Sequence, residues 1–206
     1  MKSVELRIAK MLDCEAITEW EREFAKSLLQ RIESKGFLTP RQEAYLQKME
    51  NKYSAENIQA VAAWKENFTA EMREDMKIVA NYYINNPPYF GDLARNILND
   101  ENFVPTERQY ISMMDNKYAM KVLELAKSEP LFPDGSFALI RVGKSFPGFP
   151  RNEKNRMVLI IQHSKIIKKA AKDARPVMVL PVGSTKPFWV EERDLKPTSR
   201  KKKDKK

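Results

Sequence analysis

The chain has 206 residues, 42% hydrophobic and 32% charged, and its longest purely apolar run, residues 157–161, is too short to span a bilayer. No apolar stretch follows the first few residues, so neither a secretory signal nor a membrane location is expected. The single cysteine, Cys14, excludes an intramolecular disulfide and favours a reducing location, which we take to be the cytoplasm.

The net charge of +9 is divided unevenly along the chain. Residues 1–136 carry a net charge of −4, whereas residues 137–206 carry +13. A cationic region of this density repels itself unless it faces salt or a polyanion. The expected polyanion is DNA or RNA, contacted through its phosphates.

Residues 1–128 are predicted to form a helical domain. Thr18–Glu21 has the spacing of a capping box, and Gly36 is a natural end for the helix that follows it. Thr39–Gln42 begins a second helix, with proline at its first position. The apolar spacing over residues 54–84 predicts one long helix, ended by an Asn-Asn-Pro-Pro segment.

Part of this helical pattern occurs twice. Thr106–Gln109 repeats the Thr-x-Arg-Gln start of Thr39–Gln42, and Asn116–Tyr118 repeats Asn51–Tyr53. The second copy is two residues shorter between its Gln and its Tyr. The pattern indicates a duplicated helix pair, or two helix hairpins that use the same capping chemistry. A protein partner is expected on this half.

The spacing of apolar residues changes after residue 130, so the fold class is predicted to be α+β. Strands are expected over residues 137–142 and 157–161, and a hairpin over 177–191. The run at 157–161 is apolar enough to be covered on both faces. Together with an inserted helix, these strands form a predicted domain at 132–197, and the lysine-rich residues 198–206 are predicted to be a disordered tail.

Two segments resemble known families. Residues 179–195, Val-Leu-Pro-Val-Gly-Ser-Thr-Lys-Pro-Phe-Trp-Val-Glu-Glu-Arg-Asp-Leu, are similar to the last strands of an SH3-like small β-barrel. Residues 20–46 resemble a helix-pair module of bacteriophage and bacterial proteins of DNA metabolism. The first resemblance implies a binding module, and the second implies a phage-encoded accessory protein.

The inserted helix is predicted over residues 164–174. Its four lysines recur at i, i+3, i+4 and i+7, so they would occupy one face, opposite the isoleucines and alanines. That face is either a phosphate-binding surface or an ordinary solvated one. The lysines are Lys165, Lys168, Lys169 and Lys172.

Two other groups of cations are candidates for nucleic-acid binding. Arg151, Lys154 and Arg156 follow two aromatic residues that either stack on bases or fill the core. The tail would add salt-sensitive affinity, unless it is a nuclear localisation signal or a solubility tail. Its four candidates are Arg200, Lys201, Lys202 and Lys203.

Trp189 lies between Phe188 and Val190, so in a strand its side chain must point to the opposite face from theirs. We expect the pair in the core, which leaves Trp189 exposed as a possible binding-surface aromatic.

Catalytic chemistry has little basis in this sequence. His163 is the only histidine, which excludes multi-histidine zinc sites, and no glycine-rich phosphate loop occurs. We therefore expect no catalytic residues, metal or cofactor, although scattered carboxylates leave a two-metal nuclease open. The predicted function is non-catalytic nucleic-acid binding in DNA replication, recombination or transcription; the alternatives are a protein–protein adaptor and a virion structural component.

Overall fold

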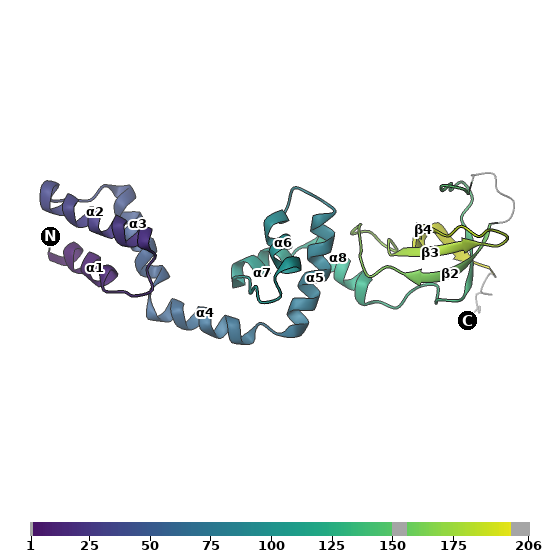
Figure 1. Ribbon diagram of the computed structural model, residues 1–206, viewed down its shortest axis with the longest axis horizontal. Helices are drawn as coiled ribbons and strands as arrows, with labels where there is room; N and C mark the ends of the chain where they lie inside the picture. The colour runs from purple at the N-terminus through teal and green to yellow at the C-terminus, as the bar shows by residue number, and fades with distance from the viewer. Residues whose placement is uncertain (1, 150–155, 199–206) are drawn as a thin grey trace, which may run out of the picture. The chain divides into compact units, whose positions relative to one another are not determined.

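The computed structural model describes residues 2–149 and 156–198, in which eight α-helices precede a five-stranded sheet (Figure 1). The fold is therefore α+β, as predicted. The chain divides into two compact units, Met1–Asn67 and Phe68–Lys206. The boundary predicted near residue 130 lies inside the second unit, where the helices and the sheet have separate hydrophobic clusters.

The first unit contains α1 (Lys2–Leu12), α2 (Glu19–Lys35), α3 (Pro40–Lys52) and α4 (Ala55–Asn67). The capping box predicted at the start of α2 is present, and Gly36 ends α2 in the left-handed conformation. Helix α3 begins after Thr39 as predicted, and Thr39 and Gln42 form a second capping box. The core of this unit forms where the apolar faces of α1, α2 and α3 meet. It includes Ile8, Leu28, Ile32, Leu46 and Met49.

The single long helix predicted over residues 54–84 is wrong. The chain leaves the helical conformation after Asn67 and begins α5 (Ala70–Ile84) with Thr69 as its N-cap. The Thr69 hydroxyl accepts a hydrogen bond from the Met72 backbone at 3.2 Å. Helical spacing continues across the break because two consecutive helices can keep the same apolar period. The two compact units divide at this break.

The second unit continues with α6 (Gly91–Asn99), α7 (Glu107–Met114) and α8 (Lys117–Lys127). Helix α7 begins after Thr106 as predicted, and Thr106 and Gln109 form a capping box. The two Asn-Lys-Tyr segments have different surroundings, because Asn51–Tyr53 lies at the end of α3 and Asn116–Tyr118 at the start of α8. The repeated Thr-x-Arg-Gln segments therefore cap α3 and α7 in the same way, whereas the repeated Asn-Lys-Tyr segments take different positions in their helices.

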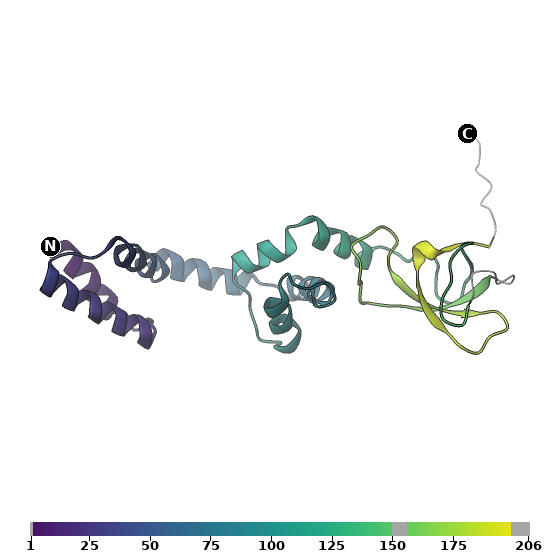
Figure 2. The same cartoon turned by 90° about the horizontal axis from the view of Figure 1, so that it is seen from above.

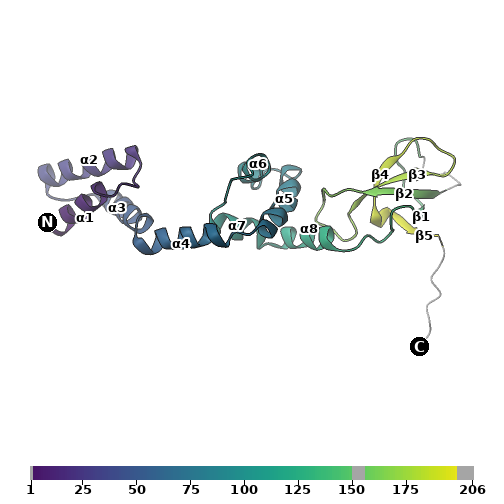
Figure 3. The ribbon, with the colours of Figure 1, turned by 60° about the horizontal axis from the view of Figure 1, so that its bottom comes forward.

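The sheet consists of β1 (Phe137–Ile140), β2 (Met157–His163), β3 (Pro176–Pro181), β4 (Phe188–Glu191) and β5 (Leu195–Pro197). All neighbouring strands are antiparallel, in the order β4-β3-β2-β1-β5, and the sheet is not closed (Figure 3). A 3-10 turn at Glu192–Asp194 joins β4 to β5. The predicted strands are confirmed.

One face of the sheet forms a hydrophobic core. Val158, Ile160 and Val190 are buried there, and Phe149 from the β1–β2 connection fills the same core. Phe146 packs against this cluster too but is only half-buried, so Phe149 belongs to the core whereas Phe146 keeps an accessible side.

The helix predicted over residues 164–174 is also wrong, because this segment contains neither helix nor strand. We call residues 164–175, which connect β2 to β3, the basic loop (Figure 2). Its ends are joined where the Ser164 backbone N–H donates to the Pro176 carbonyl at 2.9 Å. In its middle, Ile167 is buried in the helical cluster of α5–α8. These tertiary contacts override the local helical pattern.

Candidate nucleic-acid interface

The basic loop is fixed to the helical part of the second unit at three points, two of which lie in the middle of the loop. Ile167 is 1% exposed among the side chains of α5–α8, and the Asn86 side chain donates to the Lys168 carbonyl at 3.0 Å. Both contacts position the loop backbone and leave the neighbouring lysine side chains outside the core.

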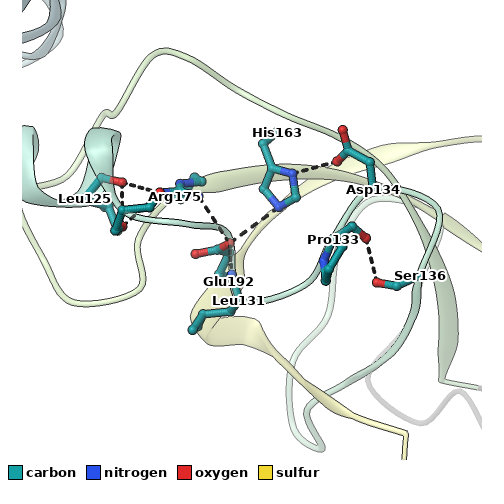
Figure 4. Close-up of polar contacts among 9 residues, drawn as sticks. Leu125, Leu131, Pro133, Asp134, Ser136, His163, Arg175 and Glu192 are labelled. Carbon is teal, nitrogen blue, oxygen red and sulfur yellow. Dashed lines mark hydrogen bonds and ion pairs between the residues drawn. The ribbon is translucent and has the colours of Figure 1, made fainter.

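A third anchor is the guanidinium of Arg175, at the end of the loop, which is 4% exposed (Figure 4). Its Nη2 donates to the carbonyls of Leu125 and Ser128, at the end of α8, and to the Ser128 hydroxyl. Its Nη1 lies 3.9 Å from Oε1 of Glu192. A buried arginine needs such partners, because an unpaired buried charge is strongly destabilising.

Glu192 is the acidic centre of this anchor and is 2% exposed. Its Oε1 accepts a hydrogen bond from the Leu131 backbone at 2.9 Å and lies 3.4 Å from Nε2 of His163. The other ring nitrogen of His163 is 2.7 Å from Oδ1 of Asp134. The histidine therefore stands between two carboxylates in a network that joins the sheet to the segment after α8 (Figure 4).

The four lysines of the basic loop are all exposed, but they do not share one face. Lys168 and Lys169 line one groove, whereas Lys172 lines a second groove with Lys121 and Glu124. The Lys169 ammonium pairs with Glu191 at 2.6 Å. In the described ranges, the other three lysines of the loop have no ion pair.

Arg156 organises the β1–β2 connection. Its guanidinium donates to the carbonyls of Ile140, Arg141 and Lys144 at 3.0, 2.7 and 3.0 Å, and it lies 5.3 Å from the ring centre of Phe149. Much of its hydrogen-bonding capacity is thus used inside the protein. The remaining candidates lie outside the described residues: Arg151, Lys154, Arg200, Lys201, Lys202 and Lys203.

The groove that contains Lys168 has a volume of about 590 Å³ and lies along β4; we call it the β4 groove. Trp189, which is 46% exposed, forms part of its lining, while Phe188 and Val190 point to the core as predicted. Two carboxylates in the groove are already paired with cations. Glu191 pairs with Lys169 and with Arg193, and Asp194 pairs with Lys144 at 2.8 Å.

The outer face of the sheet is apolar, a feature that the sequence analysis did not identify. Phe137 on β1, Leu159 on β2 and Leu180 on β3 are aligned across three strands. Met157, two residues before Leu159 and on the same side, is exposed, so the β2 run is buried on one face only. Antiparallel sheets commonly place polar side chains on their solvent face. The unbroken apolar run in β2 was the available signal for this surface.

No protein family matches this chain, and neither the curated proteins nor the solved structures include one with significant similarity to it. None of the helices in the described ranges has the length and apolar character needed to cross a bilayer. The same part of the chain contains no group of three or more His, Cys, Asp or Glu side chains arranged for a metal ion.

Proposed function

We propose that this protein is a non-catalytic nucleic-acid-binding protein that contacts phosphates through its second half. The observation that carries the proposal is a cluster of exposed lysines on one loop within a region of net charge +13. Lys165, Lys168 and Lys172 have no ion pair within the described ranges, so their ammonium groups are available to a polyanion. The setting is an accessory role in phage-type DNA replication, recombination or transcription, in the cytoplasm.

We also propose an SH3-like identity for the sheet. The β3–β4 hairpin, the buried Val190 and the 3-10 turn that carries Asp194 are features that the sequence resemblance leads one to expect. Such modules bind nucleic acids, peptides or proteins, so this identity is compatible with the proposed function without choosing the ligand.

The first unit is the proposed site for a protein partner. It exposes large apolar side chains, among them Leu6, Phe37, Ile58 and Val61. The duplicated helix pair remains a proposal, supported by the equivalent capping boxes of α3 and α7.

The test is a titration of fluorescent duplex DNA, single-stranded DNA and RNA at several salt concentrations. Replacing Lys165, Lys168 and Lys172 together by alanine is expected to weaken binding and to reduce the salt slope on duplex DNA by roughly 3. The matched control replaces Lys10, Lys35 and Lys65, exposed lysines of the first unit, and is expected to leave the slope unchanged.

Two results would contradict the proposal. The wild-type protein would show no binding at near-physiological salt, or the triple variant would bind as the wild type does. In the second case, deletion of residues 198–206 tells whether the tail alone supplies the affinity.

A second candidate function, protein–protein adaptor, is favoured by the apolar outer face of the sheet. Lys196 lies in the edge strand β5, opposite Leu139, and has no ion pair in the part of the chain that the structure describes. The face therefore fits a protein surface that is apolar at its centre and acidic at its rim. A pure adaptor would fail the nucleic-acid titration, whereas its binding to such a partner would depend less on salt.

A further inference from the structure

We propose that the β4 groove binds one base of a single-stranded nucleic acid, stacked on the indole of Trp189. This inference rests on the proposed function and names the form of nucleic acid and the residue that receives the base. The volume of about 590 Å³ lies within the range of sites that enclose small ligands.

Trp189 is suited to this role because its backbone is fixed and its ring is accessible. The residue lies in β4, opposite Met178 in β3, and its neighbours Phe188 and Val190 hold the strand against the core. The indole remains 46% exposed within the lining of the groove. A flat aromatic surface of this kind stacks on any nucleobase, because every base has a π-face.

The charges of the groove favour an anionic ligand. Its four cations, Lys144, Lys168, Lys169 and Arg193, outnumber its two carboxylates. Both carboxylates are within ion-pair distance of these cations, so neither presents an uncompensated negative charge to the ligand.

Lys168 supplies the phosphate contact beside the stacked base. Its ammonium has no ion pair within the described ranges, and its backbone carbonyl is held by Asn86. Lys165 and Lys172 lie on the same loop but outside the β4 groove, so they are expected to add phosphate contacts only when the nucleic acid extends beyond it. A duplex keeps its bases stacked on one another, so only an unpaired base can reach Trp189.

The experiment compares Trp189→Ala with Trp20→Ala, the matched control. Trp20 is also exposed, at 60%, but it belongs to the first unit. The probes are an oligothymidylate of about 12 nucleotides and a duplex of the same length, at about 0.15 M salt. Trp189→Ala is expected to weaken oligothymidylate binding roughly 5- to 100-fold. Its duplex affinity, and both affinities of Trp20→Ala, should stay within about twofold of the wild type.

Trp189→Phe keeps an aromatic ring at the same position and is expected to retain most of the lost affinity. Melting curves of all variants exclude a folding defect as the cause. If Trp189→Ala binds oligothymidylate with wild-type affinity, the stacking inference is overturned. If the binding of that variant still depends steeply on salt, the proposed function remains intact. If no nucleic acid binds to the wild type, both fail. Saturable quenching of Trp189 by a proline-rich peptide, without quenching by oligothymidylate, also overturns the inference.

Discussion

In the described part of the chain, each compact unit buries one glutamate, and the two carboxylates are stabilised in different ways. Glu21 in the first unit is 5% exposed and Glu192 in the second is 2% exposed. The Glu21 carboxylate accepts hydrogen bonds from Lys52 at 2.8 Å and from the Tyr53 hydroxyl at 2.5 Å, as well as from the backbone and hydroxyl of Thr18. Glu192 accepts one from the Leu131 backbone, while the imidazole of His163 stands 3.4 Å away and the guanidinium of Arg175 3.9 Å away.

The difference shows that a buried carboxylate can join two neighbouring helix ends or hold together several segments that are distant in the sequence. Glu21 joins the start of α2 to the end of α3 and is satisfied by direct hydrogen bonds. Glu192 connects Leu131, His163 and Arg175, which are far apart in the sequence. The second network positions the end of the basic loop, so the surface lysines of that loop depend on buried groups that never meet a ligand.

The largest expected effect comes from breaking the second network. Arg175→Ala removes the donor to the carbonyls of Leu125 and Ser128 and leaves Glu192 without its closest permanent cation. We expect a loss of about 3–5 kcal/mol in the free energy of unfolding, measured by urea denaturation. Lys172→Ala, an exposed lysine of the same loop, should change it by less than about 0.5 kcal/mol. Equal urea midpoints for the two variants would mean that the buried arginine does not hold the loop.

The corresponding change in the first unit is Glu21→Gln, with a smaller effect that depends on pH. Burial raises the pKa of Glu21, but hydrogen bonds from Lys52, Tyr53 and Thr18 outweigh burial and lower it from 4.5 to about 2. A lowered pKa stabilises the folded state above pH 4.5, and this contribution is lost as the pH falls toward 2. The substitution should therefore cost on the order of 2 kcal/mol at neutral pH and progressively less below pH 4.5.

Urea denaturation of the wild type and Glu21→Gln at several pH values measures this difference. Thr18→Ala removes one of the same hydrogen bonds but keeps the carboxylate, so it serves as a control for the loss of packing and capping. A cost of Glu21→Gln that stays constant from neutral to acidic pH would show that the charge of Glu21 contributes nothing.

The elements that the sequence predicted correctly are governed by local chemistry. The helix starts at Thr18, Thr39 and Thr106 need only side chains three residues apart, and the strands follow from short apolar runs. The two wrong helices share one cause. Periodicity over residues 54–84 cannot locate a break, and periodicity over 164–174 cannot reveal that Ile167 belongs to a distant helical cluster.

The candidate site could be predicted only in part for the same reason. The lysines of the basic loop were identified from charge, and the structure confirms that they are exposed. The sequence treated Arg156 as another phosphate contact, whereas its guanidinium donates to backbone carbonyls of residues 140–144. Such contacts depend on which distant segments become neighbours in the folded protein. The pairing of Lys169 with Glu191 and the apolar outer face of the sheet also depend on this tertiary arrangement.

The smallest expected effect compares two equivalent caps, Thr39 in the first unit and Thr106 in the second. Each hydroxyl accepts a hydrogen bond from the backbone of a glutamine three residues later, at 3.3 Å, and each glutamine side chain accepts one in return from the threonine backbone. Thr→Ala is expected to cost about 1 kcal/mol at either position. Thr39 is half-buried and Thr106 is exposed, so water replaces the lost bond less well at Thr39, and Thr39→Ala should cost more. Thermal melts of the two variants measure the difference, with serine substitutions that keep the hydroxyl as controls. A larger cost at Thr106 would show that the short helix α7 depends on its cap more than burial indicates.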